Sequence, residues 1–221
     1  MGNIKPPVTP AGVPTNLTLT AGTVFYRVHQ SRHPADSFSP VLSHRYYGGG
    51  RFDATADDSY LFIYMGSSVD VAVSETLLRD LDLTGSLRTL TKRKIIGRRI
   101  SAVELTGDIQ ITSLLSGRDL GALSQDPWLT TADPRDYAQT RHWGHWIRNH
   151  LPGTAGFVWP SRREPSGQCY ILFGDRLPPG VGLVTMSDPQ VPPGNQADFD
   201  TPVGLRALRR RLNAYGVSIT R

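Results

Sequence analysis

The feature that most constrains the fold is an uninterrupted apolar run at residues 60–65, YLFIYM. A strand with one face in water alternates polar and apolar residues, whereas a short continuous apolar run is typical of a strand buried on both faces. Residues 156–159 and 169–173 form two more apolar runs, joined by residues 160–168. The sequence therefore predicts a core built around buried strands.

Three segments have helical signals, with a polar cap at the start and apolar residues at helical spacing. In the second and third, proline follows the cap, at the first helical position where it is well tolerated. The helices are expected at residues 69–81, 133–153 and 201–216, and further strands at 23–29, 95–96, 100–105 and 109–112. Because strands and helices are interspersed without a regular strand–helix–strand repeat, the predicted fold class is α+β.

The length of 221 residues suits one domain with short extensions. Residues 1–22 are rich in Pro, Thr and Gly and are expected to be a loose lead-in to the main domain at 23–176. Residues 177–221 are expected to form a Pro/Gly-rich surface excursion, up to about residue 199, and then a C-terminal helix.

The sequence indicates a cytoplasmic protein. No window approaches 18 uncharged apolar residues, which predicts no membrane span, and the first ten residues lack the apolar core of a signal peptide. The single cysteine, Cys169, cannot form an intramolecular disulfide and lies in an apolar run, as a buried strand cysteine does.

The net charge of +5 comes almost entirely from arginine, because the chain has only three lysines. Such a surplus attracts nucleic acid, an acidic protein or an anionic small molecule. A nucleic-acid-binding module needs arginine and aromatic residues gathered on one face. Here the arginines are scattered along the chain, so this alternative is the weaker one.

A glycine triplet at residues 48–50 precedes Arg51, and Tyr64 and Glu75 follow it. Glycine lets a ligand approach the backbone closely, and arginine can hold a phosphate with two parallel hydrogen bonds. Tyr64 ends the first buried run, where its ring can stack on a flat heterocycle or pack in the core. Glu75 falls at the edge of the apolar stripe of its helix, where a carboxylate can project into a cleft. A solvated turn and a solvated helix edge remain the alternatives for Arg51 and Glu75.

Arg27 lies within an apolar strand pattern, where an unpaired charge is costly to bury. It either faces solvent or meets a carboxylate or a ligand phosphate. Ser161 follows Trp159-Pro160, so its hydroxyl is placed where a strand ends. His142 and His145 share a helix face, but no regularly spaced third ligand and no cysteine pair accompanies them, so no metal site is predicted.

The order of these blocks resembles the RES domain, a family of NAD-degrading toxins named for Arg, Glu and Ser. In that family a strand carries Tyr-Arg-Val, a Gly-Gly-Arg turn precedes an aromatic residue, a strand ends in Tyr, a helix carries Glu, and a later strand ends in Pro-Ser. One block departs, because Phe52-Asp53 stands where Trp-Asn is commoner. The corresponding residues here are Tyr26-Arg27-Val28, Gly49-Gly50-Arg51-Phe52, Tyr64, Glu75 and Trp159-Pro160-Ser161.

The resemblance implies a fold like that of ADP-ribosyltransferases, with a split mixed β-sheet and flanking helices around NAD. NAD is then a substrate, and no cofactor is expected. The implied reaction removes nicotinamide from NAD, with water or phosphate as the acceptor, and the implied partner is a Xre-like antitoxin. Neither nucleic acid nor a membrane is an expected direct partner. Transfer of ADP-ribose to a macromolecule is the alternative activity of the same pocket.

The resemblance also assigns roles. Glu75 stabilises the positive charge that develops on the ribose. Arg27 and Arg51 hold the diphosphate, with Tyr26 also in the binding site. Tyr64 stacks on nicotinamide, and Ser161 donates a hydrogen bond to a ribose, an amide or an acceptor phosphate.

Overall fold

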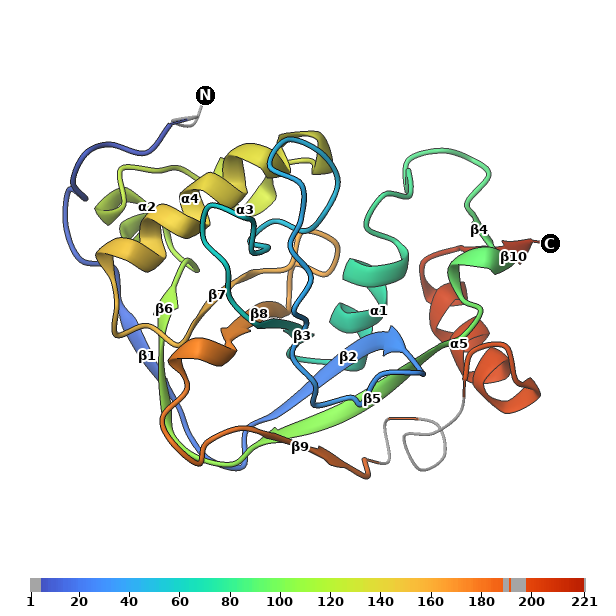
Figure 1. Cartoon of the computed structure of the whole chain (residues 1–221). Helices are drawn as coiled ribbons and strands as arrows, with labels where there is room; N and C mark the ends of the chain where they lie inside the picture. Colours follow the sequence, from blue (N-terminus) through green and yellow to red (C-terminus); the bar gives the residue numbers. More distant parts are fainter. Residues whose placement is uncertain (1–4, 189–190, 192–197, 221) are drawn as a thin grey trace.

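The structure is a computed structural model that describes residues 5–188, 191 and 198–220. Figure 1 shows a long curved sheet with helices gathered at its two ends. The strands are β1 Asn16–Leu19, β2 Val24–Gln30, β3 Phe62–Gly66, β4 Thr89–Thr91, β5 Arg98–Leu105, β6 Ile109–Ser113, β7 Gly156–Pro160, β8 Gln168–Phe173, β9 Leu183–Met186 and β10 Ser218–Thr220. The α-helices are α1 Val69–Leu77, α2 Gly117–Ala122, α3 Trp128–Thr131, α4 Tyr137–His150 and α5 Pro202–Ala214, and three 3₁₀ turns lie at Lys92–Lys94, Pro134–Asp136 and Gly174–Arg176.

The main sheet has the strand order β1-β6-β7-β8-β3-β2-β5-β9. Neighbouring strands are antiparallel except β6 and β7, which are parallel, so the sheet is mixed. A separate parallel pair, β4 and β10, lies beside α5 (Figure 1). The predicted α+β class is confirmed.

The sheet is split between β2 and β3. These two strands share a single register pair, Tyr26 with Gly66, whereas β2 pairs with β5 along its whole length from Val24 to Gln30. On the other side of the split, β3 pairs with β8 from Phe62 to Gly66. The two halves of the sheet therefore diverge beyond one contact, which leaves backbone edges facing the space between them.

Both faces of the sheet are covered. Within the run at residues 60–65 the prediction of burial on both faces is confirmed for Phe62, which packs in the cluster under α2–α4, and Ile63, which packs on the opposite face. Leu61 is 46% exposed and Tyr64 is half-buried. A third cluster joins α1 and α5 to β2 and β5. These clusters fix the divergent halves of the sheet on either side of the split.

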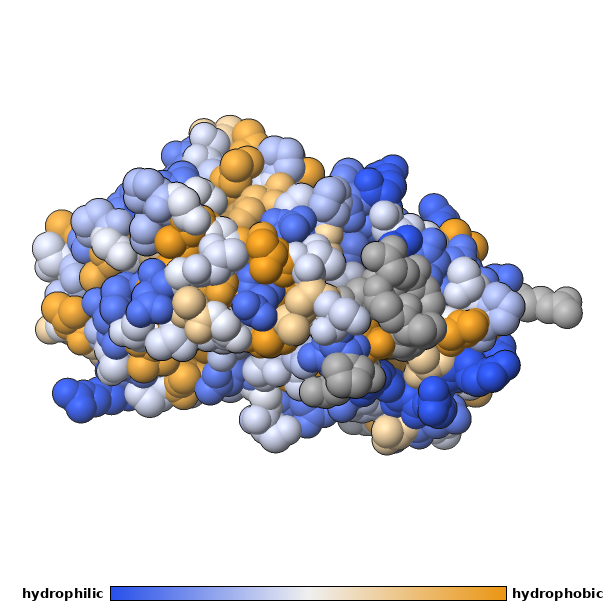
Figure 2. Space-filling model, turned by 90° about the horizontal axis from the view of Figure 1, so that it is seen from below, coloured by the Kyte–Doolittle hydropathy of each residue, from blue (hydrophilic) through white to orange (hydrophobic). Residues whose placement is uncertain are grey.

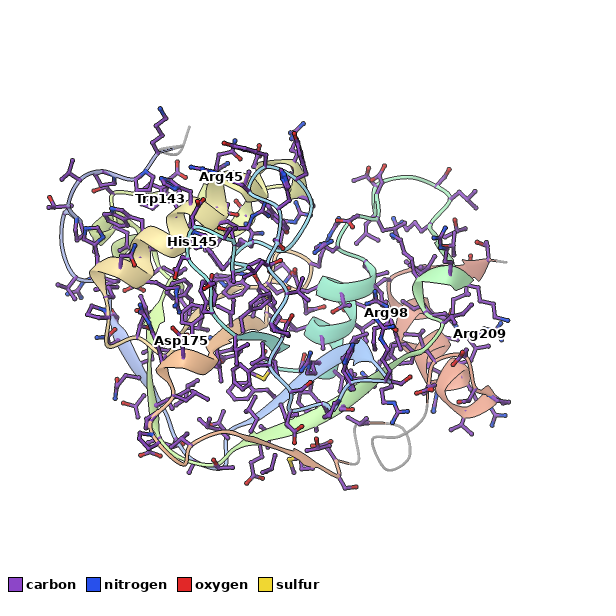
Figure 3. All side chains as sticks on the ribbon, in the orientation of Figure 1. Arg45, Arg98, Trp143, His145, Asp175 and Arg209 are labelled. Carbon is purple, nitrogen blue, oxygen red and sulfur yellow. The ribbon has the colours of Figure 1, made fainter. Side chains whose placement is uncertain are left out.

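Arg148 of α4 ties that helix to the sheet although its side chain is only 2% exposed. Its Nε donates to Asp58 at 3.0 Å and its Nη2 to Asp175 at 2.8 Å. The guanidinium also lies 3.7 Å from the ring centre of Tyr60 and 4.3 Å from that of Phe173. Paired charge and aromatic faces together make burial of this cation tolerable. Figure 3 shows Asp175 below α4, which carries Trp143 and His145.

Several local expectations differ from the structure. The strand predicted at residues 95–96 is wrong, because these residues form a turn that ends at Gly97, whose φ is +64°. The first helix ends at Leu77 rather than near 81. Residues 16–19 of the predicted loose lead-in form β1, and residues 183–186 form β9 at the sheet edge. Both are edge strands. β1 is held by pairing with β6 and β9 by pairing with β5, and neither has a strand pattern of its own in the sequence.

The division of the chain at residues 22 and 176 stays a prediction, and the part of the surface excursion at residues 189–190 and 192–197 lies outside the described residues. Within the described ranges, every helix is too short or too polar to cross a membrane. On the face seen in Figure 2, apolar residues occur in several groups among polar ones.

Candidate active site

A cavity of about 370 Å³ lies at the split in the sheet. Its walls come from β2, β3, α1 and the glycine turn, and β2 and β3 are the two strands that diverge at the split. Four arginines and one carboxylate line it: Arg27, Arg51, Arg79, Arg98 and Glu75. Such a lining favours an anionic ligand.

Glu75 is held at the cavity wall by α1. Ser68 caps this helix, since its hydroxyl accepts a hydrogen bond from Val71 N at 3.2 Å. Ala72, Glu75 and Thr76 lie on one stripe of the helix, and all three line the cavity. The predicted edge position of Glu75 therefore corresponds to a half-buried side chain that faces the cavity.

One oxygen of the Glu75 carboxylate is fixed by two donors. Ser161 Oγ donates to Oε1 at 2.6 Å, and the backbone N–H of Arg163 donates to the same oxygen at 3.0 Å. Ser161 is itself buried and accepts from Glu164 N at 2.9 Å. Among the described residues Oε2 has no hydrogen-bond partner, which leaves that oxygen for a ligand.

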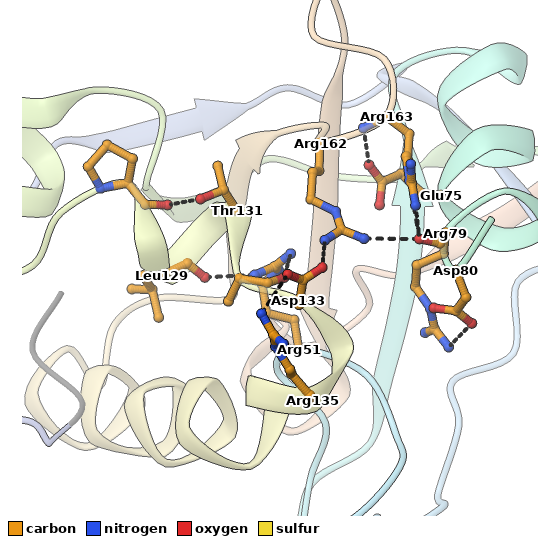
Figure 4. Close-up of polar contacts among 12 residues, drawn as sticks. Arg51, Glu75, Arg79, Asp80, Leu129, Thr131, Asp133, Arg135, Arg162 and Arg163 are labelled. Carbon is orange, nitrogen blue, oxygen red and sulfur yellow. Dashed lines mark hydrogen bonds and ion pairs between the residues drawn. The ribbon is translucent and has the colours of Figure 1, made fainter. Parts of the chain in front are cut away.

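The loop that carries Ser161 is anchored to the end of α1. Arg162 and Arg163 both donate from their guanidinium groups to the backbone carbonyl of Arg79, and Arg162 also forms an ion pair with Asp133 at 2.6 Å. Figure 4 shows both arginines reaching the backbone of Arg79, with Glu75 beside Arg163. Cations at the C-terminal end of a helix complement its carbonyls and its dipole. The anchor fixes Ser161 relative to Glu75.

The glycine turn brings Arg51 into the same cavity. Gly48 and Gly49 have φ values of +57° and +74°, a region that residues with a side chain rarely adopt. Gly50 N donates to Asp53 Oδ2 at 2.6 Å, and Arg141 Nη1 donates to Gly48 O at 2.7 Å, so the turn is held from two sides.

Arg51 is buried, with 4% of its surface exposed, and its guanidinium is already engaged. Nη1 donates to Leu129 O at 3.0 Å and Nη2 to Ala132 O at 3.2 Å, while the group lies 5.0 Å from the ring centre of Tyr137. Burial lowers the pKa of Arg51, and the charges of Tyr137 and Glu75 oppose that shift. Arginine has five N–H donors, so two carbonyls leave others for a ligand. The solvated-turn alternative for Arg51 is excluded by its burial.

Tyr64 joins the turn to β3. Its hydroxyl accepts a hydrogen bond from Phe52 N at 2.8 Å, and its ring meets that of Trp159 edge-on at 6.2 Å. Burial raises the pKa of Tyr64 well above its usual value, so the hydroxyl stays protonated. The ring lines the cavity while the hydroxyl positions the residue that follows Arg51.

Arg27 reaches the cavity from β2. Its Nη1 donates to the carbonyls of Ala35 at 2.8 Å and Ser37 at 2.9 Å, and its buried Nε has no partner among the described residues. Burial lowers the pKa of Arg27 to about 10, although the charge of Asp36 opposes the shift. A buried cation with an unused donor is stabilised when an anion binds.

Tyr26 of β2 lines the cavity too, and its hydroxyl donates to Asp188 Oδ2 at 2.9 Å. Burial and the hydrogen bond to Asp188 raise the pKa of Tyr26 to about 12. Cys169 also lines the cavity, and burial raises the pKa of its thiol, which keeps it protonated and unreactive.

The structure thus brings the predicted residues together. Five of them line one cavity: Tyr26, Arg27, Arg51, Tyr64 and Glu75. The sixth, Ser161, donates a hydrogen bond to Glu75 at the cavity wall. Sequence reasoning missed Arg79, Arg98 and Tyr137, which also line the cavity. Arg79 lies four positions after Glu75 and follows the same helical stripe, a spacing that points to it, whereas Arg98 and Tyr137 have no comparable signal. In the described part of the chain, no group of three metal-ligating side chains comes together.

The curved, split, mixed sheet with flanking helices defines an α+β protein with its cavity at the split. A similar fold is found in the crystal structure of the M. tuberculosis MbcT–MbcA toxin–antitoxin complex, with a TM-score of 0.51 and 15% sequence identity, over 76% of this chain and 86% of that one. The model of the RES domain family matches residues 24–193, and the chain belongs to this family. No curated protein matches the sequence.

Proposed function

We propose that this protein is a toxin that cleaves the bond between nicotinamide and ribose in NAD. Membership of the RES family and the fold shared with the MbcT–MbcA toxin–antitoxin complex support the proposal. The observation that carries it is the Glu75 carboxylate, which is fixed by Ser161 and Arg163 through one oxygen in a cavity where four arginines also face the ligand space.

Cleavage breaks the bond between ribose C1′ and nicotinamide N1. The electron pair leaves with nicotinamide, which departs neutral, and positive charge develops on the ribose. An oxygen of water or phosphate then bonds to C1′, and water gives its proton to solvent, whereas a phosphate oxygen has none to lose. Glu75 Oε2, which has no partner among the described residues, opposes the developing charge and so lowers the barrier more than it strengthens binding.

The remaining residues bind NAD. The guanidinium groups of Arg27 and Arg51 hold the diphosphate, through N–H groups that the protein carbonyls leave unused, with Tyr26 beside Arg27. Tyr64 stacks on nicotinamide through the ring that lines the cavity. Ser161 holds the Glu75 carboxylate in place, so its proposed role moves from contact with NAD to orientation of the catalytic carboxylate.

The proposed partner is an antitoxin of the Xre type. The MbcT–MbcA structure, whose fold is similar, is that of a toxin in complex with an antitoxin. An antitoxin that covers the arginine-lined cavity would block NAD entry, and acidic groups on it would match the lining.

The test is to incubate the purified protein with NAD, with and without inorganic phosphate and without added metal, and to identify the products. We expect free nicotinamide together with ADP-ribose or its 1″-phosphate. Label from NAD appearing on protein or nucleic acid would assign the transferase activity instead. Unchanged NAD at high protein concentration would refute the enzyme proposal.

A further inference from the structure

Arg98 lines the cavity beyond the residues assigned to NAD. It begins β5, where it pairs with Gln30 of β2, and it shares a sheet face with Ile100, which packs against α1. Figure 3 shows Arg98 beside α1. Its side chain is half-buried, and within the described ranges its guanidinium makes no hydrogen bond or ion pair.

Two further donors lie on the α1 side of this part of the cavity. Thr76, an exposed residue of α1, lines the cavity one position after Glu75, and Arg79 lines it three positions later, in the turn that follows the helix. Arg79 donates to Asp80 from Nε at 3.1 Å and from Nη2 at 3.5 Å, which leaves its Nη1 as a donor for a ligand. Burial lowers the pKa of Arg98, and the charge of Arg79 lowers it further, as expected of neighbouring cations.

The charges of the cavity do not balance with NAD alone. Glu75 is the single carboxylate among the lining residues, against four arginines. The diphosphate of NAD supplies two negative charges, and the proposed function places it on Arg27 and Arg51. Arg98 then remains without a counter-charge among the lining residues, beside Arg79, whose charge is shared with the exposed Asp80. Binding of a further anion between the two arginines would relieve their repulsion.

We propose that Arg98, Arg79 and the hydroxyl of Thr76 form a second anion subsite, which takes a dianionic phosphate group separate from the diphosphate. Phosphate monoesters carry close to two negative charges at neutral pH and offer three acceptor oxygens. Two sources supply this group: the 2′-phosphate of a phosphorylated dinucleotide such as NADP, or free inorganic phosphate. The assignment of the diphosphate to Arg27 and Arg51 rests on the proposed function, whereas the second anion subsite is argued from Arg98, Arg79 and Thr76 themselves.

The test measures binding by calorimetry in the Glu75→Gln background, so that dinucleotides stay intact. The probes are NAD, NADP, and inorganic phosphate added to the free and the NAD-bound protein. If the dinucleotide is the source, NADP binds more tightly than NAD by roughly tenfold or more, as expected for charge-assisted hydrogen bonds. If free phosphate is the source, it binds the NAD-bound protein and NADP gains nothing.

In either case Arg98→Gln should abolish the additional binding, that is, the tighter binding of NADP or the binding of phosphate, and Arg98→Lys should keep part of it. The matched control is Arg93→Gln, which removes one exposed arginine outside the cavity and should change neither affinity. The proposal is overturned if neither probe shows a gain, or if Arg98→Gln and Arg98→Lys, both folded by circular dichroism, keep it in full. Binding of inorganic phosphate that depends on Arg98 in a protein that neither binds nor consumes NAD would refute the proposed function and leave the subsite standing.

Discussion

The hydroxyl of Ser161 donates a 2.6 Å hydrogen bond to Oε1 of Glu75, although the two residues are 86 positions apart in the chain. The bond links the residue after β7 to α1, at the wall of the cavity. It leaves Oε2 without a partner in the described part of the chain, so the carboxylate is both oriented and available. The chemistry proposed for the site depends on this pair.

Ser161→Ala should lower turnover of NAD by about ten- to a hundredfold, the range expected when a hydrogen bond to a charged group is lost. NAD affinity should change much less, because the serine acts through Glu75 rather than on the ligand. Steady-state turnover and calorimetric binding check this split. The control is Ser166→Ala in the same loop, an exposed serine whose hydroxyl donates to Glu164 Oε1 at 2.8 Å. Normal turnover in Ser161→Ala would show that the bond does not orient the catalytic carboxylate.

Arg51→Lys should weaken NAD binding and also lower the free energy of unfolding, by roughly 1–3 kcal/mol. A single ammonium cannot reproduce the paired hydrogen bonds to Leu129 O and Ala132 O, and it leaves one buried carbonyl without a donor. Chemical denaturation and NAD titration measure the two effects. Arg135→Lys is the control, because Arg135 is exposed and its ion pair with Asp133 is 3.7 Å long. Unchanged affinity would remove Arg51 from the NAD-binding site, and unchanged stability would show that its two carbonyl contacts contribute little to folding.

The buried imidazole of His29 should make stability depend on pH. Its Nδ1 lies 3.0 Å from Gln30 O and its Nε2 3.0 Å from Ser101 Oγ, an arrangement that fits the neutral ring with Nδ1 as donor. Burial lowers the pKa of His29 to about 4, and the charge of Arg27 adds to the shift. The unfolded chain therefore binds the proton first, and stability is lost as pH falls from about 6.5 toward 4.

Urea unfolding from pH 7 to pH 4 measures this loss. The free energy of unfolding of His29→Gln should fall less steeply with pH than that of the wild type over that window. His142→Gln, at an exposed position, should follow the wild type. Identical slopes for wild type and His29→Gln would contradict the assignment.

Much of this site follows from local sequence patterns, and the rest depends on contacts that such patterns do not encode. The amphipathic stripe placed Glu75 at a helix edge, and the glycine triplet indicated an unusual turn before Arg51. The carbonyls that hold Arg51 belong to α3 and to the residue that follows it, and this four-residue helix has no side-chain cap and leaves no periodic signal. The cation at Arg98 enters the cavity only through the register of β5 against β2. Long-range pairing of this kind is fixed by tertiary structure.

The most direct test of the central claim is the turnover of NAD by Glu75→Gln, measured beside its NAD affinity. Glutamine keeps the size of the side chain and an oxygen for Ser161 but loses the charge that opposes the developing cation. We predict a hundredfold or greater fall in turnover, or about 3–4 kcal/mol of barrier, with affinity nearly unchanged. Turnover close to that of the wild type, in a protein that still releases nicotinamide from NAD, would contradict the role of Glu75.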